Sequence, residues 1–228
     1  KKGETFKDTA QNIEAMKIDA VVMRHPTPGA PLHLTDHIDS IVINAGDGTH
    51  EHPTQAILDM TSLHEKFGYL KGLKVGIIGD IAHSRVALSN IHGLKTMGAE
   101  VTLCGPSTLI PPFAEELGVS VNYNVDEVIE WADALNVLRI QRERMGGGLL
   151  PSVREYRNLF GITTDRLSMH KKEIVIMHPG PMNRGVEIDS SVADSDQAII
   201  LDQVLNGVAS RMAILYLLLG GKQEEGDS

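Results

Sequence analysis

The sequence has a single cysteine and fewer basic than acidic residues. Cys104 cannot form an internal disulfide, and one thiol is too few for a cysteine-rich metal site. Its place in Glu100–Gly105 (EVTLCG) predicts a small buried side chain in a strand. The formal net charge of −9 argues against nucleic-acid or acidic-membrane partners, because those surfaces require a dominant basic patch.

Long apolar runs are also absent. No run approaches the roughly 18 residues that cross a bilayer, so we expect no membrane span. The segment Ala213–Gly220 (AILYLLLG) is too short and predicts the buried end of a helix. No signal peptide is recognisable, and we expect a cytoplasmic protein. At 228 residues the chain can bury a substantial core in one large or two small domains.

Strand-like and helix-like segments alternate along the chain. Strands are expected at Ala20–Arg24, Ser40–Asn44, Lys74–Asp80, Glu100–Gly105, Val119–Tyr123, Ala134–Arg139 and Ile174–Pro181. Helices are expected at Glu4–Met16, from Pro53 to Gly68, and at Ser84–Gly98, Pro111–Leu117, Val125–Ala132, Ser152–Asn158, Asp165–His170 and Ala198–Leu219. The prolines and glycine of His25–Pro31 (HPTPGAP) predict a loop without regular structure. This order predicts an α/β fold of two α/β units with parallel sheets, bridged by helices.

The segment Gly46–Gln55 (GDGTHEHPTQ) predicts an elbow between a strand and a helix. Glycines at its start favour a turn, and Pro53 suits the first helical position because that residue needs no N–H partner. Elbows of this kind often carry binding groups, since backbone N–H groups at a helix start attract anions. On this local pattern alone, His50 and His52 are explained equally well as binding groups or as polar turn residues.

Polar clusters lie at the carboxyl ends of five of the expected strands: Arg24, Gly46–Gln55, Asp80–Arg85 (DIAHSR), Arg139–Arg144 (RIQRER) and His178–Pro181 (HPGP). Ligands of open α/β sheets lie beyond the carboxyl ends of the strands, so the clusters predict one shared site. Guanidinium groups bind carboxylate and phosphate oxygens in pairs. Three arginines at strand ends therefore suggest a small, multiply anionic ligand, although each taken singly is more simply a surface ion-pair residue.

Several common catalytic motifs are missing. The segment Gly76–Asp80 (GIIGD) lacks the G-x-G-x-x-G spacing of a dinucleotide site, and the sequence has no phosphate-binding P-loop, no G-x-S-x-G elbow and no H-E-x-x-H helix. His50 and His52 lie two residues apart without matched carboxylates. We therefore expect no metal site and no cofactor.

The motifs, taken in order, resemble the aspartate carbamoyltransferases: KKGET, VMRHP, NAGDGTHEHPTQ, IGDIAHSR, LRIQRER and HPGPMNRGVEID. The resemblance covers essentially the whole chain. HPTQ alone is shared with ornithine carbamoyltransferases, whereas R-x-Q at Arg139–Gln141 and the HPGPMNRGVEI segment identify the aspartate branch. An ornithine enzyme would be expected to carry a cysteine-containing HCLP segment at His178. The resemblance implies transfer of a carbamoyl group from carbamoyl phosphate to L-aspartate, an early step of pyrimidine synthesis that needs no cofactor.

The resemblance also implies roles for the residues that bind carbamoyl phosphate. Arg24 would contact its phosphate and carbonyl end, and His52 would donate a hydrogen bond to the carbonyl oxygen as negative charge grows there. Gln55 and the backbone carbonyls near Pro179 and Gly180 would hold the carbamoyl NH₂ group.

For aspartate, the resemblance implies that two arginines and a glutamine take the two carboxylates, namely Arg85, Arg139 and Gln141. Pro181 is a further predicted substrate-binding residue, and Glu143 would orient Arg139. Lys2 matches a family lysine that reaches into a neighbouring subunit, which implies a homotrimer with shared active sites. Regulatory or pathway-enzyme subunits are possible further partners.

The implied domain division has three parts. Residues 1–53 would form part of a carbamoyl-phosphate-binding domain that the helix at 198–220 completes, residues 54–197 the aspartate-binding domain, and residues 221–228 a tail. The family's main phosphate cradle, a Ser-Thr-Arg-Thr-Arg segment before KKGET, is absent from the sequence, so we expect an N-terminal region to be missing. Two alternatives stay open: a carbamoyltransferase for ornithine or another amino acid, and a catalytically silent trimeric homologue.

Overall fold

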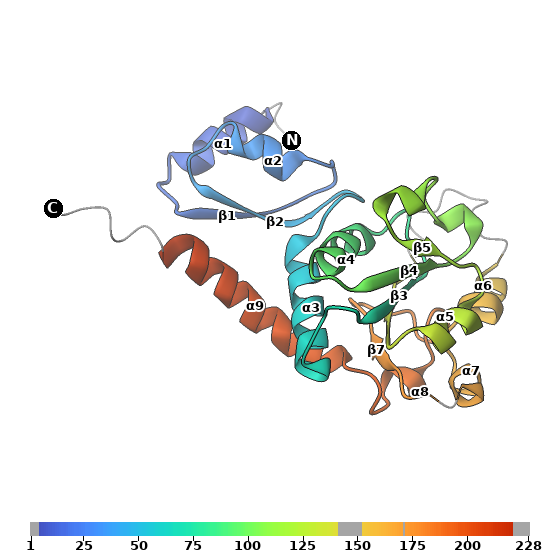
Figure 1. Cartoon of the computed structure of the whole chain (residues 1–228). Helices are drawn as coiled ribbons and strands as arrows, with labels where there is room; N and C mark the ends of the chain where they lie inside the picture. Colours follow the sequence, from blue (N-terminus) through green and yellow to red (C-terminus); the bar gives the residue numbers. More distant parts are fainter. Residues whose placement is uncertain (1–4, 141–151, 171, 221–228) are drawn as a thin grey trace.

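The computed structural model describes residues 5–140, 152–170 and 172–220 and contains two parallel sheets (Figure 1). The smaller sheet pairs β1 (Ala20–His25) with β2 (Ile41–Asp47). Helices α1 (Phe6–Glu14) and α2 (Ala30–Thr35) lie together on one side of it. Parallel pairing with helical crossovers confirms the predicted α/β fold class.

The larger sheet has five parallel strands in the order β5-β4-β3-β6-β7. Their bounds are Lys74–Ile78 (β3), Glu100–Cys104 (β4), Ser120–Val121 (β5), Ala134–Val137 (β6) and Val175–Met177 (β7). Because successive side chains of a strand point to opposite faces, the apolar runs build a core on each side of the sheet. One core includes Ile77 and Leu63, and the other includes Ile78 and Tyr156.

Helices cover both faces of this sheet. The core that contains Ile77 also contains residues of α3 (Pro53–Phe67) and α4 (Arg85–Thr96). The opposite core contains residues of α5 (Val125–Trp131), α6 (Val153–Phe160) and α8 (Ser190–Ala193). Helix α7 (Thr164–Met169) packs on its edge through Leu167. Cys104 is fully buried in β4, as predicted.

Helix α3 joins the two sheets. It begins at Pro53 and ends before Gly68, whose φ of 80° is the left-handed conformation that favours glycine at a helix end. Both bounds agree with the sequence prediction. The helix packs against α4 and α9 (Ile200–Gly220) and also contacts β2. It therefore connects the smaller sheet to the helices that pack beside the larger one.

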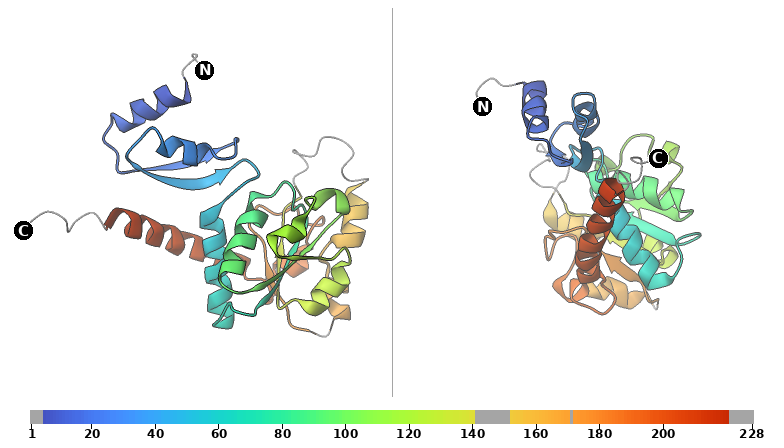
Figure 2. Two further views of the ribbon diagram at one scale, coloured as in Figure 1. Left: turned by 45° about the horizontal axis from the view of Figure 1, so that its top comes forward. Right: turned by 90° about the vertical axis from the view of Figure 1, so that its left-hand side faces the viewer.

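Only the first half of α9 is packed. Its buried residues are Ile200, Gln203, Asn206, Gly207 and Ser210. The second half extends alongside the smaller sheet (Figure 2), and Tyr216 and Leu217 are 77% and 72% exposed. The prediction of a buried end at Ala213–Gly220 was therefore wrong, because the buried positions of α9 end at Ser210.

By length and composition, α9 could also cross a membrane, with 22% of its most apolar window buried. The count of consecutive apolar residues predicts no such segment. That count missed α9 because polar residues such as Asp202 and Arg211 interrupt the run. A core helix of a water-soluble protein passes the same test of length and composition, so the finding is weak evidence for a membrane.

Three local expectations were also incomplete. Helix α2 begins inside HPTPGAP, because proline is tolerated in the first helical turn. Pro111–Leu117 contains only a short 3₁₀ helix, Ala114–Leu117, which follows another at Ser107–Leu109. Helix α8 was not predicted.

Candidate active site

A cleft of about 400 Å³ lies where α3 meets the carboxyl ends of the strands. All five polar clusters predicted from the sequence contribute to it. Its lining consists of Arg24, His52, Gln55, Ser84, Arg85, Val86, Arg139, Pro179, Gly180, Pro181 and Arg211. Among the residues that the structure describes, this lining contains four arginines and no carboxylate, so the cleft suits a ligand with several negative charges.

The elbow before α3 separates its two histidines. Asp47, buried at the end of β2, accepts hydrogen bonds from the backbone N–H of Glu51 and the side chain of Asn44, each at 3.0 Å. Nδ1 of His50 lies 3.1 Å from Oδ2 of Asp47, and His50 is exposed. The His52 side chain is only 7% exposed and lines the cleft. His50 is therefore a turn residue, and His52 has the position of a binding group.

Helix α4 holds His52 in place. The hydroxyl of Ser89 accepts a hydrogen bond from the backbone N–H of His52 at 2.8 Å and donates one to Glu51. Because Ser89 is buried in α4, the elbow is attached to the framework of the larger sheet.

Arg24 faces the imidazole of His52. Its Nε donates to the carbonyl oxygen of Ala45 at 2.8 Å, and its Nη2 lies 3.3 Å from His52 Nε2. A guanidinium can only donate, so Nε2 accepts and the ring proton is assigned to Nδ1. Burial, together with the charges of Arg24, Arg85 and Arg211, lowers the pKa of His52 to about 4. The imidazole is therefore neutral at pH 7.

The absence of a side chain at Gly46 leaves room for Arg85. Gly46 has φ of 119°, and a Cβ atom there would lie 2.9 Å from Nε of Arg85. Arg85 thus crosses directly over the backbone of the turn, and its Nη1 lies 3.4 Å from the carbonyl oxygen of Gly48. Gly46 therefore serves the cleft as well as the turn.

The segment His178–Pro181 forms another wall of the cleft. His178 is buried, and its Nδ1 accepts a hydrogen bond from the backbone N–H of Gly180 at 2.9 Å. Just beyond this segment, the Asn183 side chain donates to the carbonyl oxygen of Ile140 at 3.1 Å. This contact connects the segment to the strand end that carries Arg139.

Arg211 was missed in the sequence. It lies on α9, far along the chain from the strand-end clusters, yet it lines the cleft and two smaller neighbouring cavities. A signal was available, because Arg211 is the one basic residue in the largely apolar helix Ile200–Gly220. Strand-end reasoning could not use it, since it considers only residues that follow strands.

Three predicted site residues lie outside the described residues: Lys2, Gln141 and Glu143. Their roles stay predictions, as do those assigned to the residues in the cleft. Within the described ranges, no three His, Cys, Asp or Glu side chains cluster as a metal ion would require.

Two family models match the chain. Residues 1–65 match the carbamoyl-P binding domain, and residues 71–218 match the Asp/Orn binding domain, of aspartate/ornithine carbamoyltransferase. The catalytic subunit of aspartate carbamoyltransferase from Gemmatimonas aurantiaca is 60% identical over 227 residues, which cover 100% of this chain and 71% of that protein.

Solved structures agree with these matches. Aspartate transcarbamoylase from Trypanosoma cruzi, in complex with carbamoyl phosphate, has a TM-score of 0.85 and 30% identity, with 94% of this chain and 70% of that chain covered. Ornithine carbamoyltransferase from Pyrococcus furiosus also has a TM-score of 0.85, with 26% identity and coverage of 98% and 73%. The fold is therefore common to both kinds of enzyme, and the fold alone does not separate them.

Proposed function

This chain belongs to the aspartate/ornithine carbamoyltransferase family, and from that premise we propose how its cleft transfers the carbamoyl group of carbamoyl phosphate to L-aspartate. The products are N-carbamoyl-L-aspartate and phosphate. The assignment to aspartate carbamoyltransferase rests on the 60% identity to a named catalytic subunit over the whole chain. The observation that carries the mechanism is the convergence of four arginines on one cleft with neutral His52 and Gln55.

The charges of the two substrates match the cleft. Carbamoyl phosphate brings a phosphate dianion, and aspartate brings two carboxylates. Arg24, Arg85, Arg139 and Arg211 supply four positive charges around this space. Paired donors on each guanidinium fix the orientation of the anions as well as attracting them.

The reaction joins the aspartate nitrogen to the carbamoyl carbon and breaks the bond between that carbon and the phosphate oxygen. The attacking amine is neutral and loses one proton, which the departing phosphate can accept. Most of the catalytic effect then comes from holding the amine against the carbonyl and stabilising its oxygen as it becomes negative.

Arg24 and His52 act on the carbamoyl phosphate. In our proposal Arg24 turns from the imidazole to the phosphate and carbonyl end, which frees Nε2 of His52. The neutral ring can then carry its proton on Nε2 and donate to the carbonyl oxygen. A neutral imidazole fits this donor role, since its low pKa leaves no ionised form at pH 7.

Gln55 and the carbonyl groups near Pro179 and Gly180 accept hydrogen bonds from the carbamoyl NH₂ group. Arg85 and Arg139 take the aspartate carboxylates, with Gln141 as a further predicted partner. Arg211 adds a cation that faces His52 and the carbamoyl phosphate side of the cleft.

The alternative substrates fit less well. An ornithine side chain would bring a cation into a cleft that already contains four guanidinium groups. The relative from Gemmatimonas aurantiaca also carries the aspartate name. A catalytically silent homologue is disfavoured because Arg24, His52, Gln55, Arg85 and Arg139 are all present around one space.

We also propose a homotrimer with shared active sites, on the basis of Lys2 in the KKGET motif, and a role in pyrimidine synthesis. Regulatory or pathway-enzyme subunits could accompany the trimer. The cytoplasm is the proposed location, for which the single buried cysteine is suited.

The test measures carbamoyl aspartate formation by the purified protein, with L-ornithine as the competing acceptor and light scattering as the measure of assembly. Turnover with aspartate and none with ornithine is the expected result. Preference for ornithine would overturn the aspartate assignment, and carbamoyl phosphate binding without turnover on either acceptor would favour the silent homologue.

A further inference from the structure

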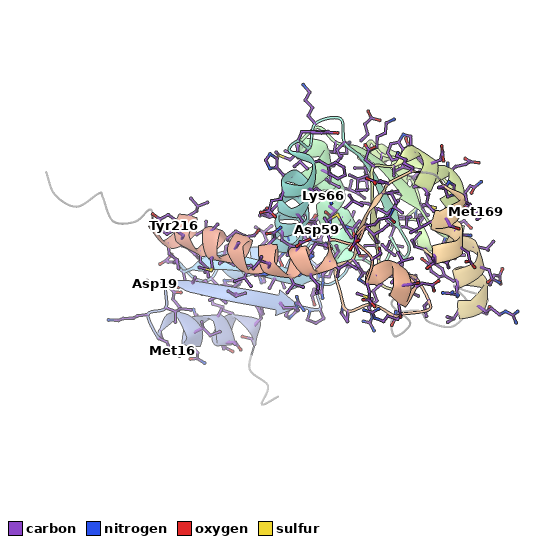
Figure 3. The ribbon with its side chains drawn as sticks, turned by 90° about the horizontal axis from the view of Figure 1, so that it is seen from below. Met16, Asp19, Asp59, Lys66, Met169 and Tyr216 are labelled. Atoms are coloured by element: carbon purple, nitrogen blue, oxygen red, sulfur yellow. The ribbon has the colours of Figure 1, made fainter. Side chains whose placement is uncertain are left out.

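The carboxylate of Asp59 is fully buried in α3, one helical turn after Gln55. Figure 3 labels Asp59 in the interior, near the junction of α3 with α9. Four side-chain amides donate hydrogen bonds to it: Gln55 and Gln203 to Oδ1 at 2.9 and 2.8 Å, and Asn90 and Asn136 to Oδ2 at 2.8 and 3.3 Å. The donors come from α3, α9, α4 and β6.

A gain in folding stability does not explain the buried carboxylate of Asp59. Burial raises the pKa of Asp59, and the four amide hydrogen bonds oppose that rise. No ion pair to Asp59 is present in the part of the chain that the structure describes. An apolar side chain at this position would avoid the desolvation of a carboxylate. The presence of Asp59 therefore indicates that it fixes the orientation of the surrounding amide groups.

The contact with Gln55 decides which way its amide points. A carboxylate accepts hydrogen bonds and does not donate them, so it selects the NH₂ group of Gln55. The amide oxygen of Gln55 is then the atom left for the cleft, which Gln55 lines. With the opposite orientation, Gln55 would present a donor and repel an NH₂ group.

The contact with Gln203 orients a second amide in the same way. Its NH₂ group binds Asp59, and its oxygen accepts the backbone N–H of His178 at 3.0 Å. His178 in turn accepts the N–H of Gly180. A continuous path of hydrogen bonds therefore runs from Asp59 to the segment Pro179–Gly180 in the cleft wall.

We propose that Asp59 is a positioning residue that aligns both sets of acceptors for the carbamoyl NH₂ group: the amide oxygen of Gln55 and the backbone carbonyls near Pro179 and Gly180. This inference rests on the proposed function, because it takes carbamoyl phosphate as the ligand. Asp59 itself does not touch the substrate. It makes the cleft select a carbamoyl group over an anion that lacks an NH₂ group.

The test compares two ligands that share a phosphate, carbamoyl phosphate and inorganic phosphate, by calorimetric titration of the purified protein. Gln203→Met removes one amide from Oδ1 and breaks the path to His178. Asn90→Leu is the matched control, because it removes one amide from Oδ2 on the opposite side of the carboxylate. Asp59→Leu removes all four acceptor contacts while keeping a branched side chain of similar shape.

Gln203→Met and Asp59→Leu should weaken carbamoyl phosphate binding by about tenfold, the upper scale of one lost hydrogen bond, and leave phosphate binding within about twofold. Asn90→Leu should leave the ratio of the two affinities unchanged. If Gln203→Met and Asn90→Leu each lower the affinities for carbamoyl phosphate and for inorganic phosphate by the same factor, Asp59 has only a structural role. If Asp59→Leu does not fold, the comparison of Gln203→Met with Asn90→Leu decides alone.

The wild-type protein separates this inference from the proposed function. If the wild type binds carbamoyl phosphate more tightly than inorganic phosphate but forms no carbamoyl aspartate, the proposed reaction is overturned and the positioning role of Asp59 stands. Normal turnover with an unchanged ratio in Gln203→Met would overturn the positioning role and leave the reaction intact.

Discussion

Nη2 of Arg24 lies 3.3 Å from Nε2 of His52, so a permanent cation faces a ring nitrogen that carries no proton while this contact is present. His52 is buried, and the charges of Arg85 and Arg211 act on it in the same direction. If the imidazole took up a proton, its positive charge would be repelled by all three of these arginines. The surroundings of the ring thus keep His52 neutral, as the proposed donation to the carbonyl oxygen requires.

His52→Ala should lower kcat far more than it raises the KM for either substrate. The hydrogen bond strengthens only as charge develops, and removal of an oxyanion donor costs about 2.7 to 4 kcal/mol of transition-state stabilisation. Steady-state kinetics with His50→Ala as the control tests this, because His50 is an exposed turn residue. A kcat within about threefold of wild type would leave His52 without the donor role.

The low pKa of His52 predicts a pH dependence of stability. The unfolded state binds a proton on this residue below pH 6.5, whereas the folded state does so only below about pH 4. The contribution is therefore neutral above pH 6.5 and becomes destabilising as the pH falls through this window, by about 3 kcal/mol at most. Urea unfolding of the wild type and His52→Gln at pH 7 and pH 5 isolates it. The wild type should lose more stability between the two pH values, and parallel losses would contradict the assigned pKa.

Arg139→Ala should raise the KM for aspartate and lower kcat, while carbamoyl phosphate binding is retained. A lost charge-assisted contact costs at least about 2 kcal/mol, or more than tenfold in kcat/KM. Arg184→Ala is a suitable control, since Arg184 forms a surface pair with Asp194 away from the cleft. An unchanged aspartate KM would remove Arg139 from the site.

Much of this site follows from a single property of parallel sheets. Carboxyl ends of adjacent strands share an edge, so Arg139 and His178–Pro181 could be placed together without coordinates. Pro53 and Gly68 likewise marked the ends of α3 through their own backbone preferences. These are local rules that depend on few residues.

The parts that were missed depend on contacts between distant segments. Arg211 reaches the cleft because α9 packs on α3, and the exposed end of α9 follows from where that packing stops. Asp59 is inconspicuous in the sequence, because its four amide partners lie on four separate elements. No periodicity in the chain signals either arrangement.

Gly46→Ala should weaken aspartate binding through Arg85. The new Cβ atom would lie 2.9 Å from Nε of Arg85, so the guanidinium must move. Gly68→Ala is the matched control, because Gly68 also has positive φ but no atom within 4 Å of its Cβ position. Both variants should lose about 1 to 3 kcal/mol of stability from backbone strain, and only Gly46→Ala should raise the aspartate KM. An equal effect of both on KM would show that Arg85 tolerates the displacement.

Arg211→Gln should change both the binding of anions and the titration of His52. Arg211 contributes to the lowered pKa of His52, so removal of its charge should raise that pKa above its value of about 4, as measured by NMR titration of the ring. The same loss should weaken carbamoyl phosphate binding, because it removes one of the four arginines that line the cleft in the described part of the chain. Arg211→Lys keeps the charge and should largely restore both properties.

Since Arg211 is exposed on α9, solvent screens its field, and both effects should grow as the salt concentration is lowered. A His52 pKa that is the same in Arg211→Gln and in the wild type at low salt would show that α9 places no effective charge at the cleft.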